Sequence, residues 1–490
     1  MSGVIDRIDR WGQIAPDRLA HVSGNRSLTY GEMMRQANIV ASYLAEALPD
    51  KSAPVIVLGH KEPEMLIAFL GAIKAGHPYI PIDNATPPQR VERVIAISGA
   101  SLTLTPARVA NVITQTTAHA FRANDQPRPD DPFYIIFTSG STGEPKGVMI
   151  THGCLESYLD WMLEEQVFAE QHETFLNQAP FSFDLSVMDL YCSLVTGGTL
   201  FSLNQIDIAN PAQLYKALAR SAATVWVSTP SFAQMCLAEW TFAETMLPHL
   251  RKFLFCGETL TPEVAAALLV RFPKAAVWNL YGPTEATVAT TSIRIVPAVL
   301  ARYRSLPVGF PKPDCRVLIM GEDGQPLNDG ERGEIVIAGP NVSPGYLNRP
   351  DLTAHAFFQL DGLRAYRTGD WGRYNDHLLF CEGRSDDQIK LHGHRIELGD
   401  VETHLQALPG VRDAIVVPKL KEGQAEWLAA FVIMSEPTHD HAFEVSRLLR
   451  SRLTERLPAY MLPRKFYFLP SFPLTANGKA DRRKLADTLL

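Results

Sequence analysis

The segment Tyr134-Ile-Ile-Phe-Thr-Ser-Gly-Ser-Thr-Gly-Glu-Pro-Lys-Gly-Val148 indicates the fold more directly than any other part of the chain. Its apolar start, residues 133–137, is typical of a buried strand. A loop of glycines and hydroxyl side chains follows, and then Lys146. Such a loop can wrap phosphate oxygens, because glycine permits close backbone approach. It is not a Walker A loop, since Gly147 follows the lysine. Two interpretations of this segment are therefore compatible with its sequence, a flexible turn and a phosphate-binding loop.

The composition is that of a globular protein. The chain has 490 residues, 46% hydrophobic and 20% charged, enough for roughly two to four domains. A net charge of −7 argues against a nucleic-acid surface. The six cysteines are scattered, so we expect neither a zinc site nor disulfides, and a cytoplasmic location. No apolar run approaches the ~20 residues of a membrane helix, so we expect no membrane insertion.

Strand-like and helix-like segments alternate through much of the chain. We expect strands at 54–59, 223–228, 252–256 and 275–279, and helices at 63–74 and 262–272. This order predicts an α/β fold with layered, largely parallel sheets and ligands at the carboxyl ends of the strands. From Cys315 to Ile337 the runs are shorter and predict antiparallel β structure. A polar stretch at 384–388 predicts a linker to a small second domain.

The segment 279–285, Asn-Leu-Tyr-Gly-Pro-Thr-Glu, follows a strand candidate. Its Gly-Pro pair is typical of a tight turn. In a functional interpretation, Tyr281 offers a flat face to a purine and Thr284 a hydroxyl to the α-phosphate. Glu285 would be an oxygen ligand for the magnesium that accompanies ATP.

Three later segments each have a structural and a functional interpretation. Residues 366–370 are expected to form a turn, in which Asp370 either caps the backbone or binds ribose hydroxyls. Arg384 is either a surface charge or a ligand for ribose or phosphate. Lys479, in a Gly-containing loop, is either solvated or neutralises charge in a transition state.

These motifs occur in the order found in the adenylate-forming enzymes, which the chain resembles from Leu28 to Lys484. The resemblance implies a large N-terminal domain (1–385) with a β subdomain and a small mobile α+β lid (386–490), with Asp386 as hinge. It implies ATP and Mg²⁺ as cofactors, Glu285 as the magnesium ligand, and Thr284, Glu285 and Lys479 as catalytic residues. The implied ATP-binding residues are Thr138, Ser139, Gly140, Ser141, Thr142, Gly143, Lys146, Gly257, Glu258, Asn279, Leu280, Tyr281, Gly282, Pro283, Thr284, Asp370, Cys381, Glu382, Gly383, Arg384 and Lys479.

Asp184 resembles the aspartate that distinguishes adenylate-forming enzymes acting on amino acids from those acting on fatty acids. It precedes a segment of helical periodicity, so it is either an N-cap or the partner of a substrate ammonium group, which is costly to bury unpaired. Segments 175–189, 225–236, 253–258 and 390–398 resemble the D-alanine–carrier-protein ligases. In that family, Asp184, Cys256, Val288 and Lys479 would contact D-alanine, with Cys256 narrowing the site for a methyl group. On its own, Cys256 is typical of a small buried hydrophobe.

The resemblance further implies transfer of D-alanine to the phosphopantetheine thiol of a small acyl carrier protein, for cell-envelope polymers such as lipoteichoic acid. We expect a freestanding enzyme without a carrier module after Leu490, and we expect a monomer. Glycine or L-alanine as substrate, an acyl-CoA synthetase, and a non-catalytic adenylate-binding protein are the alternatives. A buried carboxylate at Asp184 argues against an apolar acyl chain.

Overall fold

The computed structural model describes residues 3–50, 52–115, 127–140, 144–168, 173–384, 388–391, 393–421, 424–436, 441–473 and 481–489. The chain divides into two compact units. The first comprises Met1–Asn84, Ile97–Ile136 and Gly147–Gly383. The second comprises Ala85–Ala96, Phe137–Lys146 and Arg384–Leu490. A functional boundary at 385/386 stays a prediction, and each unit is described by itself.

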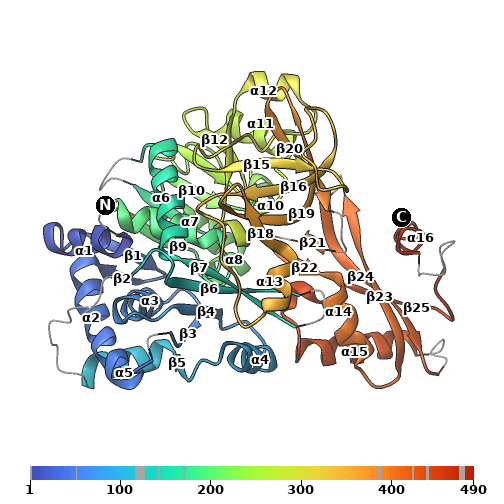
Figure 1. Ribbon diagram of the computed structural model, residues 1–490, viewed down its shortest axis with the longest axis horizontal. Helices are drawn as coiled ribbons and strands as arrows, with labels where there is room; N and C mark the ends of the chain where they lie inside the picture. The colour runs from blue at the N-terminus through green and yellow to red at the C-terminus, as the bar shows by residue number, and fades with distance from the viewer. Residues whose placement is uncertain are drawn as a thin grey trace. The chain divides into compact units, whose positions relative to one another are not determined.

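A nine-stranded sheet forms one layer of the first unit, in the order β14-β13-β12-β11-β10-β8-β9-β1-β2. Figure 1 labels its strands β12, β10, β9, β1 and β2. The strands from β12 to β1 run parallel, as the α/β pattern predicts, and β2, β13 and β14 are antiparallel edges. The strands are β1 (Leu19–Ser23), β2 (Arg26–Thr29), β8 (Thr174–Asn177), β9 (Thr199–Ser202), β10 (Val225–Ser228), β11 (Lys252–Phe255), β12 (Ala276–Tyr281), β13 (Thr291–Ile295) and β14 (Phe310–Pro311).

A six-stranded sheet has the order β17-β7-β6-β4-β3-β5. Its strands are β3 (Val55–Gly59), β4 (Tyr79–Asp83), β5 (Leu102–Leu104), β6 (Pro132–Thr138), β7 (Lys146–Thr151) and β17 (Gly345–Tyr346). The strand expected at 133–137 is therefore confirmed as β6. Parallel pairing joins β5, β3, β4 and β6, so their carboxyl ends lie at one edge of the sheet.

Helices pack against both sheets. They are α1 (Val4–Ile14), α2 (Tyr30–Ala47), α3 (Pro63–Ala75), α5 (Pro106–Gln115), α6 (His152–Gln166), α7 (Leu185–Val195), α8 (Gln205–Ala209), α9 (Pro211–Ser221), α10 (Pro230–Leu237), α11 (Pro262–Arg271), α12 (Pro297–Arg302) and α13 (Pro350–Ala356). The expected helices at 63–74 and 262–272 are α3 and α11. The sequence suggested one apolar face for α3, but nearly its whole circumference is buried, because it packs on α2, α5 and the sheet.

A five-stranded antiparallel sheet confirms the change of pattern near Cys315. Its strands are β15 (Arg316–Met320), β16 (Gly333–Ala338), β18 (Phe357–Leu360), β19 (Leu363–Asn375) and β20 (Leu378–Arg384). The prediction of a turn at 366–370 is wrong, since these residues lie inside β19. Within β19, Gly369 has a φ of 70°. The pairing register of β16 with β19 shifts between Glu334 and Val336, which lie opposite this part of β19. A bulge therefore bends the strand without ending it.

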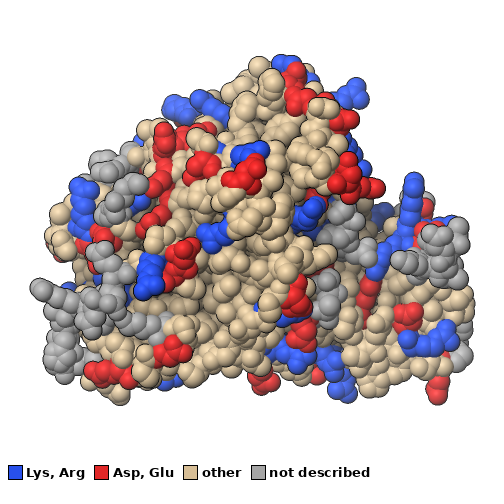
Figure 2. All heavy atoms as spheres, in the orientation of Figure 1, with Lys and Arg blue, Asp and Glu red and all other residues tan. Residues whose placement is uncertain are grey.

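The second unit contains the C-terminal elements and α4 (Pro88–Ser98), most of which belongs to it. Its other elements are β21 (Gln388–Leu391), β22 (His394–Glu397), α14 (Leu398–Gln406), β23 (Val411–Lys421), β24 (Gln424–Met434), α15 (Ala442–Thr454), β25 (Lys465–Phe468) and α16 (Arg482–Asp487). Leucine, valine and isoleucine side chains of α14, β23, β24 and α15 form its core. Acidic and basic side chains are interspersed over the face drawn in Figure 2. No helix within the described ranges is long and apolar enough to span a membrane.

A buried ammonium group ties the two large sheets of the first unit together. Lys61, which follows β3, is 1% exposed. Its Nζ donates to the carbonyls of Asn177 (3.2 Å), Gln178 (2.7 Å) and Leu203 (2.8 Å), at the ends of β8 and β9. Desolvation lowers the pKa of this lysine to about 7, and the nearby buried carboxylate of Asp189 opposes that shift.

We predict that Lys61→Met lowers the free energy of unfolding by about 3 kcal/mol, because methionine fills the space but leaves buried carbonyls without donors. Lys274, whose side chain is 77% exposed, is the control, and Lys274→Met should change stability by less than about 0.5 kcal/mol. Urea unfolding of the three proteins measures the difference. Equal stability of the wild type and Lys61→Met would show that these hydrogen bonds do not hold the sheets together.

Candidate active site

The turn after β12 carries the residues expected to bind ATP and magnesium. The 3₁₀ helix Thr284–Ala286 is followed by Thr287 (φ 53°) and Val288 (φ 68°). Left-handed backbone is strained for β-branched side chains. Asn341 stabilises the turn: its Nδ2 donates to the Ala286 carbonyl at 2.7 Å, and its own carbonyl accepts from Thr287 Oγ1 at 2.7 Å.

Glu285 is a fully buried carboxylate at the centre of this turn. Its Oε1 accepts a hydrogen bond from the hydroxyl of Tyr346 at 2.8 Å, which offsets part of the cost of burying the charge. Thr284, 8% exposed, places a hydroxyl next to it in the chain. No group of three or more His, Cys, Asp or Glu suited to a metal occurs in the described part of the chain.

Tyr281 and Asp370 meet although they are 89 residues apart. The Tyr281 hydroxyl donates to Asp370 Oδ2 at 2.6 Å, and both side chains are buried. Burial and the Asp370 charge raise the pKa of Tyr281 well above its usual value, so the phenol is neutral. The backbone N–H of Asp370 donates to Thr368 Oγ1 at 3.0 Å. These two hydrogen bonds hold Asp370, the residue that was expected to bind ribose, in one position.

Asp184 occupies the N-cap position of α7, but its side chain makes no capping hydrogen bond. It is 7% exposed. The N-cap interpretation is therefore not supported, since the buried side chain does not cap the helix.

Cys256 and Val288 lie together close to the Asp184 segment. Cys256 Sγ lies 3.4 Å from the Val288 carbonyl oxygen, and both residues are buried. A Cβ at Gly257 would lie 3.4 Å from the ring of Phe183. The segments that contain Asp184 and Cys256 are therefore in contact.

Two buried phenols belong to the same region. The hydroxyls of Tyr134 and Tyr158 have no hydrogen-bond partner among the described residues. Burial raises the pKa of Tyr158 well above its usual value, and the nearby thiols of Cys192 and Cys256 and carboxylate of Asp184 add to the shift. A buried hydroxyl without a partner is costly, so a polar ligand group near Asp184 would have a donor available.

The glycine-rich loop leaves β6 and returns into β7 at Lys146. The Thr138 hydroxyl is buried without a hydrogen-bond partner among the described residues. Ser139 Oγ donates to the Arg395 carbonyl at 2.8 Å and accepts from the Glu397 N–H at 3.2 Å. A Cβ at Gly140 would lie 2.2 Å from the Glu144 carbonyl oxygen, so only glycine fits. Thr138 thus has a hydroxyl donor that no described residue uses, where phosphate was expected to bind.

The remaining expected ATP-binding residues have diverse surroundings. Asn279 Nδ2 donates to the Pro307 carbonyl at 2.8 Å, and Leu280 is buried in the core. Glu258 accepts from the Ser231 N–H at 3.2 Å. The following positions lie at or near the ends of their elements: Gly257, Gly282, Pro283, Gly383 and Arg384. Cys381 lies in the middle of β20.

Glu382 forms ion pairs with Arg332 (3.2 Å) and Arg373 (3.0 Å). Ser141, Thr142, Gly143, Asp386 and Lys479 lie outside the described residues. Their expected roles stay predictions.

Comparison with known proteins identifies the family. The model of the AMP-binding enzymes matches residues 8–347, and the model of the AMP-binding enzyme C-terminal domain matches residues 400–479. The chain therefore belongs to the AMP-binding enzyme family.

Individual relatives resemble the chain over nearly its whole length. A D-alanine–D-alanyl carrier protein ligase of Bacillus anthracis is 48% identical over 496 residues, covering 98% of each chain. The ligase of the same name from Bacillus cereus strain B4264 is 48% identical over 497 residues, with the same coverage.

Two solved structures share the fold. An adenylation domain of Vibrio cholerae, in complex with glycyl-adenosine-5′-phosphate, has a TM-score of 0.86 at 24% identity and covers 99% of this chain and 97% of its own. A fused adenylation–PCP di-domain from Klebsiella oxytoca has a TM-score of 0.82 at 25% identity and covers 95% of this chain and 93% of its own.

Three residues of this region were not predicted from the sequence: Asn341, Tyr346 and Tyr158. Asn341 and Tyr346 lie in the segment Gly339-Pro-Asn-Val-Ser-Pro-Gly-Tyr346, whose glycines and prolines indicate a tight turn. That signal could have marked a conformationally special loop, but not its contact with Glu285. Tyr158 has no local signal, because a tyrosine on a buried helix is usually a core residue.

We predict that Tyr158→Phe leaves the free energy of unfolding unchanged or raises it by about 1 kcal/mol, because it removes a buried hydroxyl without a partner in the described structure. Tyr30→Phe is the matched control: the Tyr30 hydroxyl donates to the Gly198 carbonyl at 2.8 Å, so its loss should destabilise by about 1 kcal/mol. Chemical denaturation of both variants tests this. Equal destabilisation by the two changes would mean that Tyr158 has a partner in the unliganded protein.

Proposed function

We propose that this protein activates D-alanine with ATP and transfers it to the phosphopantetheine thiol of a small carrier protein. The observation that carries the proposal is the buried Asp184 carboxylate, which does not cap its helix and lies on a segment in contact with that of Cys256. The 48% identity to D-alanine–D-alanyl carrier protein ligases supports the choice of substrate.

In the first half-reaction, a carboxylate oxygen of D-alanine attacks the α-phosphorus of ATP. A new P–O bond forms, the bond to the β-phosphate breaks, and pyrophosphate leaves. Asp184 holds the substrate ammonium, while Cys256 and Val288 limit the side chain to about a methyl group. Asp370, fixed by Tyr281, accepts hydrogen bonds from the ribose hydroxyls. Thr138 and Lys146 bind phosphate oxygens, and Lys479 neutralises charge at the α-phosphate.

Magnesium fits the donors at the turn after β12. Glu285 supplies a buried carboxylate and Thr284 a hydroxyl, both hard oxygen donors. Magnesium usually takes few protein ligands and completes its shell with phosphate oxygens and water, which agrees with the small number of acidic side chains here. When bound, the ion would neutralise charge on the phosphates.

In the second half-reaction, the thiol sulfur attacks the carbonyl carbon of the alanyl-adenylate. The thiol loses its proton, a thioester forms, and AMP leaves. We propose that the C-terminal part, 386–490, rotates about Asp386 between the two steps and takes Lys479 out of the site. ATP and carrier protein are both supplied in the cytoplasm, where we place the enzyme as a monomer that serves cell-envelope polymers such as lipoteichoic acid.

Glycine and L-alanine are the competing substrates, because each fits a site of this size. The Vibrio cholerae adenylation domain, whose structure holds glycyl-adenosine-5′-phosphate, shares the fold at 24% identity. The acyl-CoA synthetase alternative would leave the buried Asp184 carboxylate facing an apolar chain.

We predict that D-alanine supports the fastest amino-acid-dependent ATP–pyrophosphate exchange in a panel with L-alanine, glycine, D-valine and butyrate. D-valine should be slow because of its volume, and butyrate because it has no ammonium group to pair with Asp184. The readout is kcat/KM for each acid. Faster exchange with butyrate or D-valine would contradict the proposal, and faster exchange with glycine would reassign the substrate.

We predict that Cys256→Ala reduces the preference for D-alanine over L-alanine about tenfold in kcat/KM, the effect of a change of roughly one methylene in a hydrophobic site. Cys236→Ala is the control: Cys236 is also buried, but in the separate core around Trp226. That variant should keep the D/L ratio. An unchanged ratio in Cys256→Ala would show that Cys256 only fills space.

A further inference from the structure

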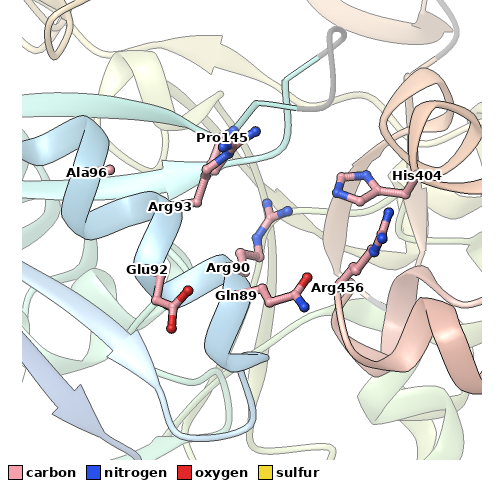
Figure 3. A pocket seen from close by; sticks show the side chains of 8 residues that line it. All are labelled: Gln89, Arg90, Glu92, Arg93, Ala96, Pro145, His404 and Arg456. Atoms are coloured by element: carbon pink, nitrogen blue, oxygen red, sulfur yellow. The ribbon is translucent and has the colours of Figure 1, made fainter. Parts of the chain in front are cut away.

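A cavity of about 570 Å³ lies within the second unit (Figure 3). Gln89, Arg90 and Arg93 of α4 line one side, and His404 of α14 and Arg456, just after α15, line the other. In Figure 3, the side chains of Gln89 and Arg90 extend toward His404 and Arg456. The volume lies within the range of small-molecule sites.

The charge of the cavity is predominantly positive. Three of its lining residues are arginines, and Glu92 is its one lining carboxylate among the described residues, directed away from His404 and Arg456 in Figure 3. Figure 2 shows Lys and Arg side chains gathered in the region that Figure 1 labels α4 and α15.

The basic side chains differ in how they are neutralised. Arg90 Nη1 lies 3.5 Å from Asp400 Oδ2, and Arg93 pairs with Glu144. His404 Nδ1 lies 3.1 Å from Asp400 Oδ1, and this carboxylate raises the pKa of the imidazole.

One buried carboxylate, Asp400, is thus shared by an arginine and a histidine. The half-buried guanidinium of Arg456 has no hydrogen bond or ion pair within the described ranges. The cavity therefore holds an arginine whose donors are used by none of the described residues.

The cavity also adjoins the glycine-rich loop, because Pro145 lines it and Lys146 follows directly. The proposed adenylation releases pyrophosphate from the nucleotide that this loop is expected to hold. Guanidinium groups suit phosphate oxygens, since they present several donors in one plane.

We propose that this cavity is a binding site for the pyrophosphate product, with Arg456 and Arg90 as its anion ligands. The inference rests on the proposed function for the identity of the anion. The cavity would be a second phosphate-binding site next to the glycine-rich loop. Pyrophosphate would move into it from the loop after the P–O bond has broken.

The test is isothermal titration calorimetry of the full chain with pyrophosphate, orthophosphate and phosphopantetheine. We expect pyrophosphate to bind most tightly, and Arg456→Gln to weaken it about tenfold by removing charge-assisted hydrogen bonds. Arg456→Lys, which keeps the charge but loses the planar donors, should be intermediate. Arg452, exposed in the last turn of α15 and not a lining residue, is the control, and Arg452→Gln should bind as the wild type does.

Equal pyrophosphate affinity in the wild type and Arg456→Gln overturns the proposal. Tighter, Arg456-dependent binding of phosphopantetheine overturns the assignment to pyrophosphate, as does equal affinity for orthophosphate. Thermal unfolding of each variant checks that the fold is retained, and Arg456→Lys keeps the test decisive if Arg456→Gln is unstable.

Exchange kinetics separate this inference from the proposed function. Arg456→Gln should raise the KM for pyrophosphate about tenfold and leave the KM for ATP and for D-alanine unchanged. If the wild type shows no exchange with D-alanine, the proposed substrate is wrong. The calorimetric titrations still decide whether the cavity binds pyrophosphate, because they do not depend on the substrate.

Discussion

The arrangement of the first unit depends on the buried ammonium group of Lys61. Its three hydrogen bonds join the loop after β3, in the six-stranded sheet, to the ends of β8 and β9, in the nine-stranded sheet. Apolar packing alone is non-directional and would let these sheets slide against each other. A buried charge has no such freedom, because each displacement would leave polar groups without partners.

The same region contains a connected buried polar network. Asn177 Nδ2 lies 3.1 Å from each carboxylate oxygen of Asp189, and Ser202 Oγ donates to Asn177 Oδ1 at 2.9 Å. Since Ser202 uses its only hydrogen there, it must accept from Nε2 of His21, 3.0 Å away. Nε2 of His21 therefore carries a proton, and burial keeps the ring neutral by lowering the pKa of His21 to about 3. This network fixes β8 and α7, and Asp184 lies between them.

The turn after β12 combines strained backbone with residues of the proposed active site. Two successive β-branched residues, Thr287 and Val288, adopt left-handed backbone at a cost of roughly 1–3 kcal/mol each. Hydrogen bonds from and to Asn341, each worth about 1 kcal/mol, offset part of that strain. The same short turn contains both Glu285 and Val288, so a single loop serves both the proposed metal site and the proposed amino-acid site.

Periodicity and motif order determined the alternation of strands and helices, the antiparallel region after Cys315 and the candidate site residues. These features depend on neighbours within a few residues, so local patterns report them. The burial of α3 on nearly all sides and the course of residues 366–370 through a strand were not predicted, because partners on distant elements decide them. Likewise, only the tertiary structure brings Tyr281 to Asp370, Asn341 to Ala286 and Lys61 to Leu203. Contacts over such sequence separations leave no local signature, since they form only when the sheets and helices pack around one core.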